Sequence, residues 1–174
     1  MVSTHHERAS IELLTVYQVS KILGSSLDIY KTFREALNVM VSLMGWRRAI
    51  VSLQTEQGTL EGMCAVGLSR EESAKLVFAV GEGIVGRVFA SGLPMVVPDI
   101  QAEPLFLNRS GAADQSPNDS IAYIATPIKA DRRTLGVLTM DRLVTDRSGV
   151  FDEDLRLLSM VATSCSGTVK LDLV

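Results

Sequence analysis

The chain has 174 residues, of which 47% are hydrophobic and 21% are charged, and this length is enough for one globular domain with its own core. Its formal net charge of −3, from 17 Lys and Arg residues against 20 Asp and Glu residues, argues against nucleic acid or an acidic membrane surface as a direct partner. It has no apolar run long enough to span a membrane and no signal-peptide pattern, so we expect a cytoplasmic protein.

The first half of the chain predicts a polar tail, two helices and a β-hairpin. Residues 1–9 are polar and are expected to be a disordered tail in front of a domain that spans residues 10–174. Apolar residues recur first at helical spacing and then, after Gly45, at alternate positions. The predicted helices cover residues 10–23 and 28–44, and the predicted strands cover residues 47–55 and 59–66.

The second half predicts further strands, interrupted by short helices. Ser69 and Glu72 fit a capping box, and Pro98 favours an edge position for the strand that contains it. Predicted strands cover residues 75–80, 95–100, 121–130 and 134–143, and predicted helices cover residues 83–92 and the segment from Phe151 onward. Residues 101–120 are polar and irregular, which is typical of a functional lid or a disordered loop.

The predicted elements together indicate an α+β fold. Short links between successive strands require antiparallel pairing, so we expect a central antiparallel sheet of about six strands. The N- and C-terminal helices are expected on one face of this sheet, and the short helices with the 101–120 segment on the other.

The last predicted helix carries an apolar seam with steps of three and four residues. The seam consists of Leu155, Leu158, Ala162, Cys165 and Val169. Such a seam is normally buried against another helix, and we do not expect three long helices all to find room inside one subunit. We therefore expect a homodimer through the terminal helices.

Several segments carry a resemblance to a known family of sensory modules. They are Gly81-Glu82-Gly83-Ile84-Val85-Gly86, Gly92-Leu93-Pro94 with Val96-Val97-Pro98-Asp99, Tyr123-Ile124-Ala125-Thr126-Pro127-Ile128, Leu135-Gly136-Val137-Leu138-Thr139-Met140-Asp141, and Phe151 to Leu158. Together they resemble the GAF domain. The resemblance covers about residues 12–170 and implies a small-molecule-binding regulatory module.

A narrower similarity lies in Ser26-Leu27-Asp28, Glu103-Pro104-Leu105-Phe106 and Leu138-Thr139-Met140-Asp141-Arg142. These segments resemble the N-terminal domain of NifA-type, Nif-specific regulators, which activate sigma-54-dependent transcription of nitrogen-fixation genes. The resemblance implies control of an ATPase domain and a DNA-binding domain. The chain has neither a GxxxxGK[ST] phosphate loop nor a helix-turn-helix, and it lacks the N-terminal iron–sulfur cysteines of some relatives, so we expect no cofactor.

Residues 81–86 also match the GxGxxG pattern of dinucleotide-binding sites, and Asp99 follows near the spacing of a ribose-binding acid. The helix between them has room for only about eight residues, whereas a parallel crossover needs a dozen or more. We therefore expect Gly81 and Gly83 to supply positive φ angles at a turn, and Gly86 to allow close packing of helix on sheet.

Other polar residues give weak signals for chemistry. Asp141 and Arg142 are expected to form a local ion pair or a solvated pair, since no nucleophile elbow accompanies them. Cys64 and Cys165 lie 101 residues apart outside any CxxC motif, and they are interpreted as buried, reduced thiols. No metal site is predicted, and His5-His6 falls in the polar tail.

The 101–120 segment contributes to the predicted ligand site. Leu105, Phe106 and Leu107 are apolar and are expected to anchor it to the sheet, with Arg109 facing a pocket. A guanidinium suits bidentate capture of a carboxylate. The predicted ligand-binding residues are Val88, Phe89, Phe106, Arg109, Tyr123 and Thr126. The alternative is a mobile loop with Arg109 in solvent.

Three functions remain in competition. The first is a sensory domain that binds a small metabolite, for which the resemblance implies 2-oxoglutarate as one candidate. The second is a ligand-free domain for dimerisation or protein interaction, with a collapsed pocket. The third is an enzyme such as a GAF-fold methionine sulfoxide reductase, which we do not expect because that chemistry needs reactive thiols.

Overall fold

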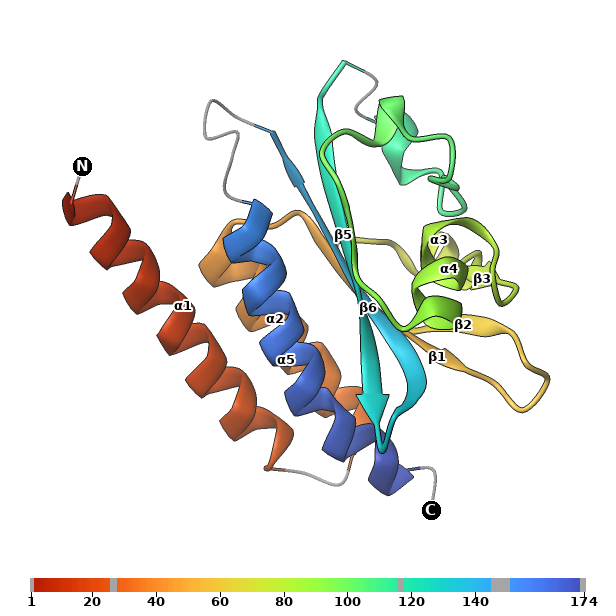
Figure 1. Cartoon of the computed structure of the whole chain (residues 1–174), viewed down its shortest axis with the longest axis horizontal. Helices are drawn as coiled ribbons and strands as arrows, with labels where there is room; N and C mark the ends of the chain where they lie inside the picture. The colour runs from red at the N-terminus through yellow and green to blue at the C-terminus, as the bar shows by residue number, and fades with distance from the viewer. Residues whose placement is uncertain (1, 26–27, 116–117, 145–150, 173–174) are drawn as a thin grey trace.

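The structure, a computed structural model, describes residues 2–25, 28–115, 118–144 and 151–172. In this part of the chain, long helices cover one side of a central sheet and short helices cover the other (Figure 1). The long helices are α1 (Val2–Leu23), α2 (Ile29–Met44) and α5 (Phe151–Asp172). The short ones are α3 (Arg70–Ala74), α4 (Gly83–Ser91) and the 3-10 turns η1 (Ile100–Ala102) and η2 (Ala112–Gln115). The predicted α+β fold is confirmed.

The sheet of the described residues has six strands in the order β3-β2-β1-β6-β5-β4, and every neighbouring pair is antiparallel. The strands are β1 (Arg48–Gln54), β2 (Leu60–Val66), β3 (Val77–Phe78), β4 (Met95–Val97), β5 (Ile121–Ala130) and β6 (Arg133–Leu143). The central hairpin turns at Asp131 and Arg132, whose φ angles of 49° and 68° suit a two-residue connection between twisted strands.

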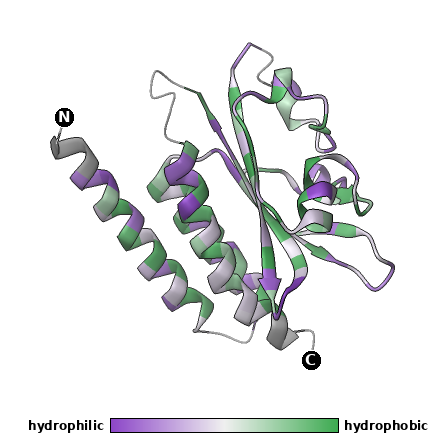
Figure 2. Ribbon diagram, viewed as in Figure 1, coloured by the Kyte–Doolittle hydropathy of each residue, from purple (hydrophilic) through white to green (hydrophobic). Residues whose placement is uncertain are grey.

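Pairing register gives the two faces of the sheet different characters. Partners directly across antiparallel strands share a face. On the face toward the long helices, Ala49, Met140 and Ile124 lie in one row, and all three are buried. The sheet strands carry mostly hydrophobic residues, whereas α1 mixes hydrophobic and hydrophilic residues along its length (Figure 2). Of the two apolar clusters in the described residues, the one on the helix-covered face is the larger.

Helix boundaries agree with the sequence signals except at the N-terminus. Asp28 caps α2 by accepting a hydrogen bond from the Lys31 amide at 3.0 Å, and Gly45 ends that helix with a φ of 67°. Helix α1 begins at Val2, so the prediction of a disordered tail over residues 1–9 is wrong for residues 2–9. Arg8 supplies a reason, because its side chain reaches the first turn of α5 and ties this end of α1 down.

The apolar seam of α5 is occupied within the chain itself. Leu158, Ala162, Cys165 and Val169 are each no more than 1% exposed, in the core that α1, α2 and the sheet share. The expectation that this seam provides a dimer contact is therefore wrong. One sheet face accommodates all the long helices because α1 packs against α2 and α5 (Figure 1).

The GxGxxG segment forms a tight turn into α4. Gly81 and Gly83 have φ angles of 86° and 60°, and a Cβ on Gly86 would lie 2.3 Å from the Ala79 carbonyl oxygen. The strand that follows, β4, pairs antiparallel with β5. These residues therefore make a packing turn, as predicted, and the parallel crossover of a dinucleotide fold does not form here.

Candidate functional site

A row of polar side chains crosses the sheet on the face opposite the long helices. Arg48 of β1 pairs in register with Asp141 of β6, and Asp141 pairs in register with Tyr123 of β5. These residues are between 6% and 8% exposed. The row forms a polar floor among apolar residues of this face, which also carries the buried hydroxyls of Ser52 and Thr139.

Arg48 and Asp141 form a buried ion pair. The Arg48 Nε donates to Asp141 Oδ2 at 2.6 Å. The other carboxylate oxygen, Oδ1, is also buried, and no group among the described residues donates a hydrogen bond to it. Burial raises the pKa of the Asp141 carboxyl, and the Arg48 charge opposes that shift. The floor thus holds an acceptor that the protein leaves unused.

Tyr123 lies beside this pair. Burial is the main cause that raises the pKa of its hydroxyl, and the neighbouring Asp141 charge acts in the same direction. The phenol therefore stays protonated throughout the neutral range, with a hydroxyl proton to donate. Phe106 meets the Tyr123 ring edge to face, with ring centroids 5.2 Å apart.

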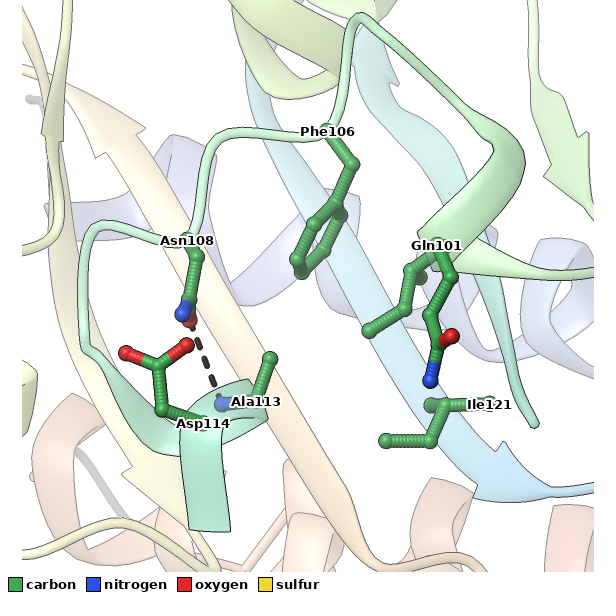
Figure 3. A pocket seen from close by; sticks show the side chains of 7 residues that line it. Gln101, Phe106, Asn108, Ala113, Asp114 and Ile121 are labelled. Carbon is green, nitrogen blue, oxygen red and sulfur yellow. Dashed lines mark hydrogen bonds between the residues drawn. The ribbon is translucent and has the colours of Figure 1, made fainter. Parts of the chain in front are cut away.

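Residues of the 101–120 segment cover this floor, although residues 116 and 117 lie outside the described part of the chain. Leu105, Phe106 and Leu107 pack against the apolar cluster on this face of the sheet, which confirms that they anchor the segment. Asn108 Oδ1 accepts a hydrogen bond from the Ala113 amide at 3.2 Å and closes the loop on itself (Figure 3). The anchored loop carries Arg109 to the edge of the floor.

Two contacts hold the Arg109 side chain, one with a carboxylate and one with an aromatic ring. Its Nη2 pairs with the Glu82 carboxylate, which lies at the entry to α4, and its guanidinium lies 5.9 Å from the centre of the Phe78 ring. The Arg109 side chain is 40% exposed. The guanidinium therefore stands at a rim, with the Glu82 carboxylate on Nη2, and no second carboxylate of the described residues pairs with it.

Two cavities lie under the segment. The larger has a volume of about 180 Å³, with Ile100, Ile121 and Phe106 as apolar lining and Gln101, Asn108 and Asp114 as polar lining (Figure 3). The smaller, of about 40 Å³, lies over the polar floor and is lined by Arg48, Asp141, Tyr123 and Arg109. Phe106, Asn108 and Ala113 line both cavities, so the two cavities are neighbours.

The structure brings together half of the predicted site residues. Phe106, Arg109 and Tyr123 all line the smaller cavity. Thr126 does not, because it is three residues from Tyr123 on the same strand and so lies on the opposite face of the sheet. Its hydroxyl lies 3.3 Å from that of Ser159 on α5. The prediction that Thr126 lines the pocket with Tyr123 is wrong, because strand alternation puts the two side chains on opposite faces.

Val88 and Phe89 are the other two predicted residues that the structure places elsewhere. Val88 is fully buried in the apolar cluster between α4 and the sheet, and Phe89 packs against the same cluster. Neither lines the two cavities under the 101–120 segment. The apolar periodicity of Val88 and Phe89 therefore indicates the face of α4 that packs on the sheet and not a ligand site.

Arg48 and Asp141 are the site residues that sequence reasoning missed. Asp141 was expected to pair with or accompany Arg142, but consecutive residues of a strand point to opposite faces. The sequence does contain a signal for Asp141. It is a charged residue at the end of the apolar run of β6, and strand alternation assigns it to the same face as Tyr123.

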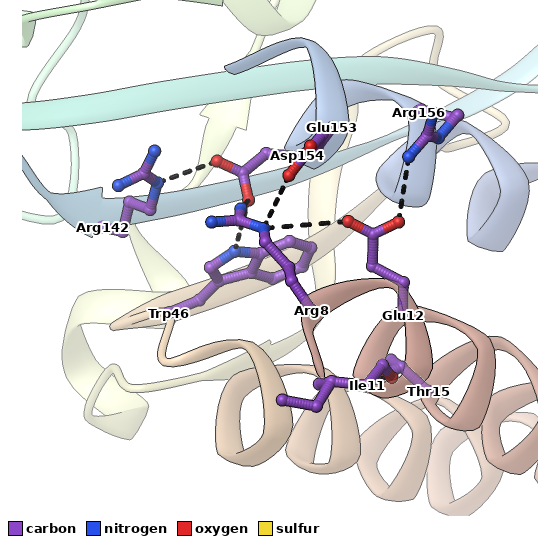
Figure 4. A network of polar contacts seen from close by, with 9 residues as sticks. All are labelled: Arg8, Ile11, Glu12, Thr15, Trp46, Arg142, Glu153, Asp154 and Arg156. Atoms are coloured by element: carbon purple, nitrogen blue, oxygen red, sulfur yellow. Dashed lines mark hydrogen bonds and ion pairs between the residues drawn. The ribbon is translucent and has the colours of Figure 1, made fainter. Parts of the chain in front are cut away.

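On the helix-covered face, Arg142 belongs to a second polar network (Figure 4). The Asp154 carboxylate of α5 is 1% exposed and accepts hydrogen bonds from Arg142 Nε at 2.9 Å, Arg8 Nη2 at 3.2 Å and Trp46 Nε1 at 3.4 Å. Arg8 Nε also lies 2.8 Å from the Glu153 carboxylate. The network joins α1, α5 and β6.

Other chemistry finds little support in the described residues. They contain no group of three His, Cys, Asp or Glu side chains placed to hold a metal ion, and none of their helices is long and apolar enough to cross a membrane. Cys64 and Cys165 are buried and unbonded, as predicted. Burial raises the pKa of Cys165 to about 12 and also raises that of Cys64.

Comparison with known protein families gives a consistent result. A model of the GAF domain matches residues 28–169. The Nif-specific regulatory protein of Herbaspirillum seropedicae is 43% identical over 162 residues, which make up 93% of this chain and 30% of that protein. That of Azospirillum brasilense is 43% identical over 164 residues, 94% of this chain and 26% of that protein.

A more distant relative is the nitrogen fixation protein VnfA of Azotobacter vinelandii, which is 35% identical over 161 residues, 91% of this chain and 31% of that protein. The chain therefore spans about a third or less of the length of each of these relatives.

Solved structures resemble the fold closely. A GAF domain named nlh2 from A. aeolicus, in an inactive state, superposes with a TM-score of 0.84 at 25% identity and covers 94% of this chain and 98% of its own. A free methionine-R-sulfoxide reductase from Neisseria meningitidis superposes with a TM-score of 0.78 at 19% identity, over 96% of this chain and 94% of its own. The second likeness concerns the fold alone.

Proposed function

This chain belongs to the GAF domain family, and on that premise we propose that it is the ligand-sensing regulatory domain of a Nif-specific activator of transcription. The proposal includes the output domains that the resemblance implies, an ATPase domain and a DNA-binding domain, which this domain would control. The similarity to Nif-specific regulatory proteins over more than nine-tenths of the chain supports this assignment.

The ligand of the proposed sensor is a small anionic metabolite held under the 101–120 segment. The observation that carries this proposal is the position of Phe106, whose side chain lines both the larger cavity, with its mixed lining, and the smaller cavity over the polar floor. Displacement of the Phe106 ring would open one site, with Arg109 as the principal contact for a carboxylate. The resemblance suggests 2-oxoglutarate as a first compound to test.

Binding there would act on the long helices through β6. Asp141 faces the ligand site, and the next residue, Arg142, is bound to Asp154 of α5 on the other face. A ligand that favours one of two positions of this strand would favour one arrangement of α1 and α5. The helices would then pass the change to the output domains.

The alternative function is ligand-free dimerisation or binding of a partner protein. The volume of the smaller cavity favours it, because about 40 Å³ is far below the several hundred that small-molecule sites commonly have. Exposed apolar residues on α1 favour it too. Leu13 and Tyr17 are 72% and 65% exposed, one turn apart on the helix side away from the sheet. We propose a homodimer through this side of α1, which is compatible with both functions.

The domain is proposed to be a binding module and not a reductase. Reductase chemistry of this kind depends on reactive thiolates. Cys165 lies on the core-facing side of α5, with its pKa raised to about 12, and Cys64 is buried in β2. Neither cysteine lines the cavities under the 101–120 segment.

Native mass spectrometry of the purified domain tests the sensory function most directly, because a retained metabolite is weighed together with the protein. We expect a bound small acid that is lost when the domain is denatured. Calorimetric titration with 2-oxoglutarate and related dicarboxylates then measures affinity. A domain that retains nothing, and binds none of these acids at millimolar concentration, would favour the interaction function instead.

A further inference from the structure

The polar floor of the smaller cavity contains an acceptor that matters for the class of ligand. Asp141 is only 6% exposed, and it lines the cavity. One of its carboxylate oxygens accepts a hydrogen bond from Arg48. The other oxygen, Oδ1, is buried without a donor among the described residues. An ionised carboxylate offers about four acceptor positions, so Oδ1 can take a new donor while Oδ2 keeps Arg48.

Leaving such an oxygen without a donor has a free-energy cost, which is larger for a charged group than for a neutral one. A ligand that brings an N–H group to Oδ1 removes that cost. A ligand that brings only oxygen acceptors places one negative partial charge against another and keeps the cost. The floor therefore discriminates between ligands by what they donate.

The other groups around the cavity have complementary roles. Arg109 stands at the rim as a donor for a carboxylate, and Tyr123 offers a hydroxyl that can donate to an oxygen. Beyond Phe106 the larger cavity presents Ile100 and Ile121 next to the polar Gln101, Asn108 and Asp114, a lining that suits an aliphatic or mixed side chain. The site thus offers separate positions to three groups of a ligand. A charged donor can bind at Asp141 Oδ1, a carboxylate at Arg109, and a side chain in the larger cavity.

We propose that this site reads an α-amino acid, with the ligand ammonium on Asp141 Oδ1, the ligand carboxylate on Arg109 and the side chain in the larger cavity. This inference rests on the proposed sensory function and narrows it. Among small carboxylates, it selects those that carry an ammonium group at C2 over those that carry an oxo group there. It therefore places 2-oxoglutarate below its amino counterpart.

Matched ligand pairs test the proposal on the wild-type domain. L-glutamate and 2-oxoglutarate differ only at C2, and so do L-leucine and 4-methyl-2-oxopentanoate. We expect the tighter-binding amino acid to exceed its oxo partner by about ten- to a hundredfold in calorimetric affinity, the effect of one charge-assisted hydrogen bond. An oxo acid that binds as tightly as its amino partner overturns the inference and leaves the sensory function standing.

A variant assigns the discrimination to Asp141. In Asp141→Asn the side-chain oxygen can keep Arg48 while the amide NH₂ replaces the free acceptor with a donor, so we expect the preference within each pair to fall at least about tenfold. Asp119→Asn is the control, because it removes the same charge from an exposed position outside both cavities. An unchanged preference in Asp141→Asn overturns the proposal.

The two proposals fail in different ways. If none of the four compounds binds but native mass spectrometry finds another retained metabolite, the amino-acid inference is overturned and sensing remains. If no metabolite is retained either, both are overturned. Because the ligand pairs are compared on the wild-type domain, poor folding of Asp141→Asn does not prevent a decision.

Discussion

Asp141 and Arg142 are consecutive residues of β6 that form ion pairs on opposite faces of the sheet. Asp141 binds Arg48 under the 101–120 segment at 2.6 Å, and Arg142 binds Asp154 of α5 at 2.9 Å. Strand alternation produces this division, since neighbouring side chains point to opposite sides. The proposed ligand floor and the helix layer are therefore connected through one peptide unit.

Asp154→Asn should lower the free energy of unfolding by about 3 kcal/mol, because Arg142 and Arg8 would lose the charge of a buried shared partner. Denaturant titration followed by circular dichroism measures this. Asp152→Asn, an exposed acid in the same first turn, is the control and should cost less than about 1 kcal/mol. Equal losses in the two variants would show that Asp154 acts only through the helix dipole.

Arg109→Ala should weaken binding of a carboxylate ligand by about ten- to a hundredfold, since a charge-assisted hydrogen bond is lost. Glu82→Gln should act in the opposite direction, because it removes the carboxylate that competes for the same guanidinium. Calorimetry on both variants gives the comparison. Arg87→Ala, an exposed arginine of α4, is the control for net charge. If Arg109→Ala binds as tightly as the wild type, the site lies elsewhere.

The pH dependence of stability should reveal the buried Asp141. Because burial raises its pKa above the ordinary 3.8, the folded state binds this proton more tightly than the unfolded state. The contribution of Asp141 is thus fully present below pH 3.8 and is lost as the pH rises through the folded-state pKa.

We therefore expect the stability of the wild type, relative to Asp141→Asn, to fall as pH rises through that window, by at most about 1.4 kcal/mol per pH unit. Urea titrations of both proteins over a pH series measure the difference. A relative stability that increases with pH would mean that attraction to Arg48 exceeds the effect of burial.

Both cysteines should be unreactive in the folded domain. The raised pKa of Cys165, about 12, leaves almost no thiolate at pH 8, and Cys64 is also buried with a raised pKa. Ellman's reagent should label neither thiol until denaturant is added, and then both. Rapid labelling of either cysteine in the native protein would reopen the reductase function.

Leu13→Glu should convert the proposed homodimer to monomer. Leu13, Leu14 and Tyr17 are exposed apolar residues on the outer side of α1, and a carboxylate among them would be buried unpaired at an interface. Light scattering at several concentrations gives the mass. Leu93→Glu is matched to it, since Leu93 is 64% exposed and lies just beyond α4. A wild-type domain that is monomeric at high micromolar concentration contradicts the proposal.

Local sequence signals predicted most of the fold. The Ser69–Glu72 capping box and the helix ends at Gly45 and Gly92 all occur where the sequence placed them. Each depends on a few consecutive residues, which the sequence displays directly. The predicted strand over residues 75–80 shortened to Val77–Phe78, because only Leu60 and Glu61 lie opposite it.

Contacts between distant segments were harder to predict. Arg8 was assigned to a tail because nothing near it in sequence requires a helix, whereas its partners are Glu153 and Asp154. Arg48 has no partner nearby in the sequence, and only the pairing of β1 with β6 places it beside Asp141. Phe106, Arg109 and Tyr123 were correctly associated, because a long loop with an apolar anchor has few places to dock.

The short outer strands also determine how the sheet can meet another protein. β3 has two residues and β4 has three, and Pro98 directly follows β4 without an N–H group to offer. An added chain would find few free backbone groups in line, so the sheet resists extension and the edge-to-edge growth that leads to fibrils. Association of this domain with other chains should therefore depend on side-chain surfaces, and concentrated samples should remain free of cross-β aggregates.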